Sequence, residues 1–238
     1  MPFAAGWAAR ASRRILDNVD MFIVQTEFQK QKFIQQGIPA GRIGIVPGIM
    51  PRIEPAGEWF PGNTVTFVGR VSEEKGINEF LEAARRLPEI PFAVAGSCDG
   101  MPEVADRAPA NVHFYGFLRG EELRRAYLDA RIILVPSKWY EGFPNVIVMG
   151  MMLERPIITA AIGATGSIIA DGVDGLLFQP GDAAALREKI AELYPDVERC
   201  REMGKHGRKQ AENLYSREMI YRTLEHIYQE AEHHNAER

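Results

Sequence analysis

Glu141 is the residue of this chain whose surroundings most strongly indicate chemistry. It precedes Gly142 in a loop that follows a short apolar run, residues 132–135. The segment after the loop, residues 143–150, has the composition of a buried helix, with Pro144 near the first turn, where its missing N–H costs nothing. A strand leading through such a loop into a helix N-terminus favours anion binding, because free N–H groups and the positive end of the helix dipole face the crevice. We therefore favour a Glu141 that faces a sugar or its hydroxyl groups over an exposed loop glutamate or a helix-cap partner.

A second candidate site is the loop at residues 69–76, which reads GRVSEEKG and follows another apolar run. Gly69, directly after a strand, allows the backbone to approach a ligand closely. Arg70 offers a bidentate fork and Lys75 a point charge, a pairing that suits a diphosphate. An equally weighted alternative is that both cations only pair with the two loop glutamates. The loop matches neither the phosphate loop GxxxxGK(S/T) nor the dinucleotide fingerprint GxGxxG.

The remaining reactive residue types are not arranged for catalysis or metal binding. None of the five histidines is spaced with a serine, cysteine or carboxylate in the pattern of a triad or a metal site. Cys98 and Cys200 lack zinc-site spacing and indicate a reducing compartment. Met149, Met151 and Met152 fit a core better than a cofactor site. We therefore expect neither a metal nor a cofactor.

The composition is that of a soluble globular protein. The chain has 238 residues, 46% of them hydrophobic and 25% charged, with a net charge of −4, which argues against nucleic acid as a partner. No apolar run approaches the roughly 18–20 residues of a membrane span. Arg10, Arg13 and Arg14 could rest on a membrane surface beside Trp7 and Ile15, although a solvated helix face is the favoured interpretation. The sequence predicts a cytoplasmic protein, with peripheral membrane contact left open.

These candidate sites are embedded in alternating strand and helix patterns. Short apolar runs predict strands, and apolar residues at helical spacing predict helices between them. The strand candidates are residues 21–24, 43–46, 65–68, 92–95, 112–115, 132–135, 157–159 and 176–178; the helix candidates are 7–17, 27–36, 77–87, 123–130, 183–215 with an interruption near Pro195, and 216–231. Continuous apolar strands alternating with amphipathic helices predict an α/β fold with a doubly wound parallel sheet.

The pattern also predicts how the chain is divided. Residues 64–215 contain a Rossmann-like domain, and residues 51–63 are a linker crowded with proline and glycine. Residues 1–50 hold too few elements to bury a core and look like the end of a preceding α/β domain. Residues 216–238 form a closing helix.

Several motifs, in order and spacing, resemble the C-terminal half of retaining family 4 (group 1) glycosyltransferases of the GT-B fold. They are Gly69-Arg70 followed by Lys75-Gly76, PSKWYEGFPNVIV at 136–148, ERPIIT at 154–159 and GLLFQPGD at 175–182. The resemblance covers residues 64–232, and residues 9–50 resemble the end of that family's N-terminal domain and the hinge. It implies that residues 216–238 are a crossover helix.

The resemblance implies transfer of a hexosyl unit, with retention, from a nucleotide-diphosphate sugar to a glycan or lipid-linked glycan, in polysaccharide or glycolipid synthesis. Glu141 would be the first glutamate of the Glu-x7-Glu motif, close to the transferred sugar. The donor would be held without a metal by Gly69, Arg70, Lys75, Gly142 and the backbone around Phe143, Asn145 and Val146.

Four positions depart from the family pattern. Met149 stands where the second glutamate accepts hydrogen bonds from the ribose, which a thioether does far less well. Ser167 and Gly166 stand where glutamate and proline are common, and Glu154 replaces a usual glycine. The glycine-rich loop of the family's N-terminal domain has no counterpart in this sequence.

Three hypotheses follow. In the first, the chain is a fragment or truncated product that retains the donor-binding half of a transferase. In the second, it is a subunit of a split GT-B enzyme whose N-terminal domain is carried by a partner chain. In the third, it is a degenerate nucleotide-binding module without catalysis, marked by Met149 and Ser167. We rank them in this order.

Overall fold

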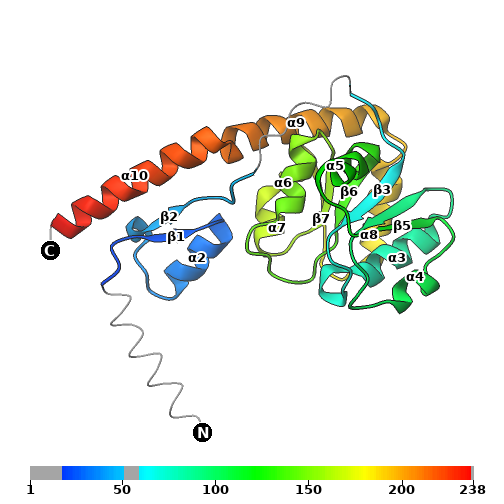
Figure 1. The fold of residues 1–238 in the computed structure, drawn as a ribbon, viewed down its shortest axis with the longest axis horizontal. Helices are drawn as coiled ribbons and strands as arrows, with labels where there is room; N and C mark the ends of the chain where they lie inside the picture. Colours follow the sequence, from blue (N-terminus) through cyan, green and yellow to red (C-terminus); the bar gives the residue numbers. More distant parts are fainter. Residues whose placement is uncertain (1–17, 51–58, 237–238) are drawn as a thin grey trace, which may run out of the picture.

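The larger part of the molecule is built on a six-stranded parallel sheet (Figure 1). The computed structural model describes residues 18–50 and 59–236, so the predicted helix at 7–17 and most of the predicted linker lie outside it. The strand order is β5-β4-β3-β6-β7-β8, with every neighbouring pair parallel. The strands are β3 (Thr64–Val68), β4 (Phe92–Ala95), β5 (Val112–Gly116), β6 (Ala130–Val135), β7 (Ile157–Ala160) and β8 (Gly175–Phe178). The predicted doubly wound parallel sheet is confirmed.

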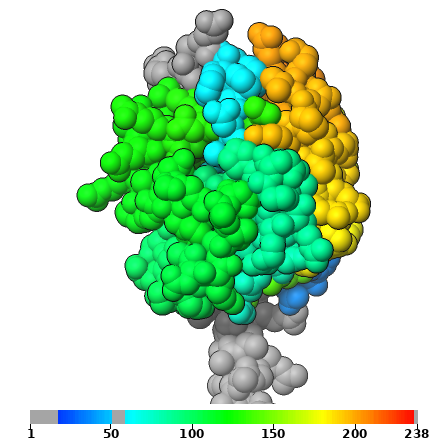
Figure 2. Space-filling model, turned by 90° about the vertical axis from the view of Figure 1, so that its right-hand side faces the viewer, coloured from blue at the N-terminus to red at the C-terminus, as the bar shows by residue number. Residues whose placement is uncertain are grey.

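Helices cover both faces of this sheet, which is why its strands carry continuous apolar sequences. One face packs against α3 (Ile77–Arg86) and α8 (Ala183–Leu193), and the other against α5 (Gly120–Asp129) and α6 (Asn145–Met152). The helix α9 (Val197–Tyr215) contributes buried residues to both cores. Strands β4 and β7 are buried along their whole length, whereas β5, at the sheet edge, is partly exposed (Figure 2).

Two short helices of this region were not predicted, α4 (Glu103–Arg107) and α7 (Gly163–Ile168). The sequence of α7 begins Gly-Ala-Thr-Gly-Ser, which has weak helix propensity and resembles a loop. The predicted break near Pro195 is present, because α8 ends at Leu193 and Asp196 caps α9 by accepting a hydrogen bond from Arg199 N at 3.0 Å.

A small unit precedes the sheet domain. It consists of β1 (Phe22–Val24), α2 (Glu27–Gln35), a 3-10 turn (Ala40–Arg42) and β2 (Ile43–Ile45), with β1 and β2 parallel. Thr26 caps α2 by accepting a hydrogen bond from Gln29 N at 3.3 Å. No residue of α2 is buried, so these elements by themselves do not enclose a core.

The last helix, α10 (Arg217–Ala236), runs from the end of α9 alongside the small unit (Figure 1). Ile220 and Ile227 are buried there, but Met219 and Tyr228 are 40% and 60% exposed. The apolar residues of α10 are therefore covered only in part by the residues that the structure describes.

Candidate functional site

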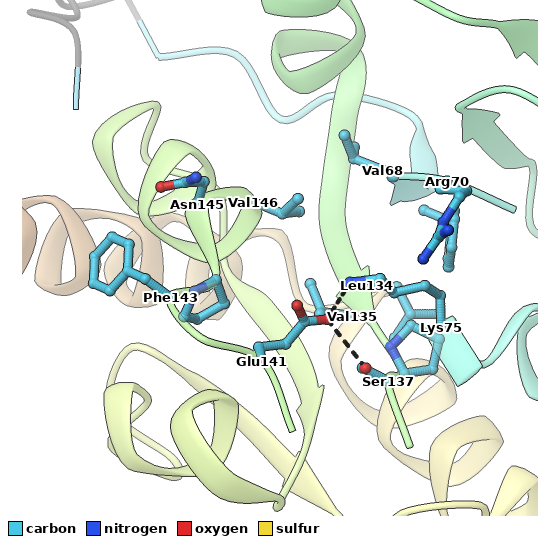
Figure 3. Close-up of a pocket in the computed structure, with 14 residues that line it drawn as sticks. Val68, Arg70, Lys75, Leu134, Val135, Ser137, Glu141, Phe143, Asn145 and Val146 are labelled. Atoms are coloured by element: carbon cyan, nitrogen blue, oxygen red, sulfur yellow. Dashed lines mark hydrogen bonds and ion pairs between the residues drawn. The ribbon is translucent and has the colours of Figure 1, made fainter. Parts of the chain in front are cut away.

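Most of the predicted site residues line a cavity of about 360 Å³ at the carboxyl ends of β3 and β6, namely Gly69, Arg70, Lys75, Glu141, Phe143, Asn145 and Val146. Gly142 and Met149 are not among the lining residues. Residues 67–70 and Lys75 come from one side, residues 134–137 form the floor, and residues 143–146 come from the start of α6. Glu141 lies between the two sides (Figure 3). The charged and polar side chains of Arg70, Lys75, Ser137 and Glu141 thus gather at the carboxyl edge of the sheet, where ligands bind in open α/β folds.

Glu141 is held by two partners inside the cavity. Its carboxylate accepts a hydrogen bond from Ser137 Oγ at 3.2 Å and forms an ion pair with Lys75 Nζ. The Glu141 and Lys75 side chains are 17% and 27% exposed. Neither predicted alternative describes Glu141: it is neither an exposed loop residue nor a helix cap.

The contact between Lys75 and Glu141 depends on close packing of two loops. Gly76 has φ of +80°, and a Cβ on it would lie 2.0 Å from the carbonyl oxygen of Pro136. Lys138 N donates a hydrogen bond to the Glu74 carbonyl at 2.8 Å, so a backbone hydrogen bond also joins these two loops. A glycine at position 76 therefore brings Lys75 within reach of Glu141.

Arg70 lies at the mouth of the cavity and pairs with a loop glutamate. Its Nη2 is 3.0 Å from Glu74 Oε1, and its side chain is 70% exposed. The pKa of Glu74 is below its usual range, chiefly through a hydrogen bond from its own backbone N–H and, less strongly, through the Arg70 charge. Thus the alternative of pairing within the loop describes Arg70, whereas Lys75 reaches across to Glu141.

Gly69 provides space beside Arg70. Its φ is +139°, a conformation that L side chains rarely adopt, and no atom lies within 4 Å of the position its Cβ would occupy. The backbone of the neighbouring strand also comes close, since a Cβ on Gly96 would be 1.8 Å from the Gly69 carbonyl oxygen. Glycine at position 69 therefore leaves space at this edge of the cavity, and glycine at position 96 allows the backbone to approach Gly69 closely.

The N-terminus of α6 presents few free donors. Pro144 occupies the cap position and has no N–H, and Asn145 N already donates to the Phe143 carbonyl at 3.0 Å. Val146 N has no acceptor among the residues that the structure describes. Of the two N–H groups from Asn145 and Val146, the one on Val146 is therefore available to a ligand.

Met149 does not line the cavity. It is partly buried and packs against the core formed by α6, α9 and the sheet. Ser167 likewise lies away from it and donates its hydroxyl to the Ala164 carbonyl at 3.0 Å. Neither of these two departures from the family motif is therefore among the residues that line this cavity.

Sequence reasoning missed Ser137, which is fully buried and orients Glu141. Its place directly after an apolar strand and four residues before a carboxylate was the available signal. It also missed Gly48, whose Cβ would lie 2.6 Å from Phe143 Cδ1, so that the segment after β2 lies against the start of α6. That contact joins segments far apart in sequence and has no local signal.

Within residues 18–50 and 59–236, no group of three or more His, Cys, Asp or Glu side chains is arranged to hold a metal ion. In the same ranges, no helix has the length and apolar content needed to cross a membrane.

The parallel sheet, the cavity at its carboxyl edge and the long final helix define the C-terminal portion of a GT-B fold. A family model described as glycosyl transferases group 1 matches residues 62–196, more than half of the chain. The chain belongs to this family of glycosyltransferases.

Known relatives agree with this assignment. The capsular polysaccharide biosynthesis glycosyltransferase CapM of Staphylococcus aureus is 26% identical over 172 residues, which are 69% of this chain and 45% of CapM. The chain spans about half the length of the curated relatives it matches.

Solved structures show the same fold. A sucrose-phosphate synthase from Thermosynechococcus elongatus matches with a TM-score of 0.78 at 24% identity, over 92% of this chain and 60% of that one. Anabaena Alr3699/HepE, solved in complex with UDP and glucose, matches with a TM-score of 0.76 at 18% identity, over 88% of this chain and 63% of that one.

Proposed function

We propose that the cavity binds a nucleotide-diphosphate sugar and that this chain supplies the donor side of a retaining hexosyl transfer. The acceptor would be a glycan or lipid-linked glycan, in the synthesis of a polysaccharide or glycolipid. The observation that carries the proposal is the meeting of Lys75, Glu141 and the start of α6 in one cavity.

In this proposal the diphosphate lies between the two sides of the cavity. Arg70 and Lys75 approach it from the β3 side, and the free Val146 N–H and the positive end of the α6 dipole from the other. A cavity of about 360 Å³ is within the usual range for small-molecule sites.

Ligand binding then exchanges partners at Lys75. A diphosphate carries more negative charge than one carboxylate and competes with Glu141 for the Lys75 ammonium group. Glu141, still held by Ser137, is left with acceptor oxygens for hydroxyl groups of the donor sugar. Without ligand, the same pair keeps the Lys75 charge neutralised inside the cavity.

The chemical step breaks the bond between the anomeric carbon and the phosphate oxygen, and the electron pair leaves with the diphosphate. The acceptor hydroxyl bonds to the same face of the anomeric carbon, and its proton passes to the leaving phosphate. Arg70, Lys75 and the α6 N-terminus stabilise the charge that develops on the diphosphate, which lowers the barrier. Loss of one such donor typically costs about 2.7–4 kcal/mol of barrier.

The two partners of the ion pair make opposite predictions for binding of free UDP or GDP. Lys75→Ala should weaken binding about 10- to 100-fold, because a charge-assisted hydrogen bond is lost. Glu141→Gln should tighten it about two- to fivefold, because Lys75 no longer has a competing carboxylate. Isothermal titration calorimetry with each nucleotide measures both effects.

The ion pair between Lys205 and Glu202 on the exposed face of α9 provides a matched control. Lys205→Ala and Glu202→Gln should leave nucleotide binding at the wild-type value. The proposal is wrong if Lys75→Ala and Lys205→Ala bind UDP and GDP equally well.

Met149 supports a second candidate function, a nucleotide-binding module that does not catalyse transfer. If only the missing ribose contact limits binding, Met149→Glu should tighten nucleotide affinity by roughly 1 kcal/mol, about fivefold, with Met149→Leu as the apolar control. Equal affinity of the two variants would show that residue 149 does not reach the nucleotide, as its absence from the cavity lining suggests.

A further inference from the structure

The loop that carries Glu141 is in contact with the small N-terminal unit as well as with the sheet domain. The Tyr140 ring stacks on the Phe28 ring of α2, with centroids 5.1 Å apart and planes 23° apart. Tyr140 directly precedes Glu141 in the chain, so only one peptide unit separates the stacked residue from the residue that carries the carboxylate.

The stack lies in a recess provided by a glycine. A Cβ on Gly163, at the start of α7, would lie 2.6 Å from Tyr140 Cδ1 and 3.4 Å from Phe28 Cε1. Gly163 also has φ of +54°, which favours glycine on its own. Three separate segments, α2, the loop after β6 and the start of α7, therefore meet at this ring pair.

Two glutamines of the small unit lie on the other side of Glu141, beside Gly142. The position of a Cβ on Gly142 would lie 3.5 Å from Gln25 Oε1 and 3.8 Å from Gln29 Nε2. Gln29 is itself held, since Gln25 N donates to its Oε1 at 2.7 Å. The small unit therefore contacts Tyr140, directly before Glu141, and lies beside Gly142, directly after it.

The ring pair is poorly suited to a role in overall stability. Tyr140 is 58% exposed and Phe28 is half-buried, so the pair removes little apolar surface from water. The stacked rings instead act locally, because they set the distance between α2 and the loop that carries Glu141.

We propose that Phe28 and Tyr140 are positioning residues that set the location of Glu141 from the N-terminal unit, and thereby tune recognition of the donor's sugar. This rests on the proposed function, in which Glu141 faces the sugar while Arg70 and Lys75 face the diphosphate. Loss of the stack should therefore affect binding of a sugar nucleotide more than binding of the free nucleoside diphosphate.

The binding test compares UDP with UDP-glucose and GDP with GDP-mannose. For whichever base binds, Phe28→Ala and Tyr140→Ala should lower the ratio of sugar-nucleotide affinity to nucleoside-diphosphate affinity about three- to tenfold. Tyr140→Phe and Phe28→Tyr keep two stacked rings and should therefore keep the wild-type ratio of sugar-nucleotide to nucleoside-diphosphate affinity. Equal weakening of both ligands, or no change in either, would overturn the proposal.

A readout without ligand separates this proposal from the proposed function. The chain has three tryptophans, and Trp139 lies in the same loop as Tyr140. With 5-fluorotryptophan incorporated, Phe28→Ala should shift the Trp139 fluorine resonance, assigned with Trp139→Phe, and leave that of Trp59 in place.

Phe33→Ala is the matched control, because Phe33 is on the same helix but contacts Phe22, at 6.0 Å between ring centroids. An unmoved Trp139 resonance in Phe28→Ala, or an equal shift in Phe33→Ala, would refute the coupling. A wild-type chain that binds none of the four nucleotides would refute the proposed function, while the fluorine shift would still decide whether α2 positions the loop.

Discussion

At the scale of single residues, the site depends on backbone conformations as much as on charged groups. Gly69, Gly76 and Gly163 all have positive φ, and they lie next to Arg70, Lys75 and the Tyr140 ring. Glu154 has φ of +55° without being a glycine. The departure from the family's usual glycine at this position thus coincides with a left-handed conformation that an L side chain adopts only at a cost.

Glu154→Gly should stabilise the chain. Relief of the left-handed strain, of about 1–2 kcal/mol, exceeds the added entropy of glycine in the unfolded state, leaving a gain of about 0.5–1 kcal/mol. For a chain of this size that corresponds to a rise in Tm of about 1–4 °C, measurable by calorimetry.

Glu154→Ala is the control, because it removes the carboxylate near Arg208 but keeps the Cβ. It should not raise Tm. An equal rise in both variants would mean that the side chain's charge, and not the backbone conformation, is responsible.

At the scale of elements, the strands and helices bring two loops from distant parts of the sequence into contact. Lys75 follows β3 and Glu141 follows β6, and these strands are neighbours in the sheet. Parallel strands place their carboxyl ends at one edge, and the short loops there have little freedom to diverge.

Gly76→Ala should disrupt this contact more than a comparable substitution elsewhere. Gly116 is the matched position, because its φ is +73° but no atom lies within 4 Å of a Cβ there, whereas at Gly76 the Pro136 carbonyl is 2.0 Å away. Both variants carry the left-handed penalty, and Gly76→Ala adds about 1–3 kcal/mol of overpacking. Urea denaturation should show this difference in the free energy of unfolding.

Gly76→Ala should also weaken UDP or GDP binding, since Lys75 is displaced, and Gly116→Ala should not. If both variants lose the same stability and bind nucleotide alike, the close approach of the two loops does not matter to the site.

Strand positions were predictable from sequence because buried parallel strands are short apolar runs. The predicted runs at 65–68, 92–95 and 132–135 lie within β3, β4 and β6. The ion pair between Lys75 and Glu141 was not predictable, since it depends on strand order and on the close approach at Gly76. The α7 helix was missed because its glycines and Thr165 carry no helical signal, and it forms through tertiary contacts.

At the scale of the whole molecule, α9 and α10 connect the two sheets. The ribbon shows α10 running beside β2 of the small unit (Figure 1). Ala211 and Tyr215 of α9 belong to the core of the sheet domain, and Ile227 of α10 packs against Gly44 of β2. A Cβ on Gly44 would lie 2.3 Å from Ile227 Cδ1 and 2.7 Å from Cγ1. The packing of α10 on β2 therefore requires glycine at position 44, because a larger residue there would collide with the Ile227 side chain.

Gly44→Ala should push α10 away from β2, because overpacking of this kind typically costs about 1–3 kcal/mol. Amide hydrogen exchange in α10 should then become faster around residue 227, while exchange in β3, β4 and β6 stays slow. Gly41→Ala, where no atom lies within 4 Å of a Cβ, is the control and should leave α10 protected. Ile227→Ala alone should also speed exchange, but added to Gly44→Ala it makes room for the new methyl group and should restore part of the protection. Additive losses in the double variant would mean that Gly44 and Ile227 act independently, and that α10 is held to the small unit by other contacts.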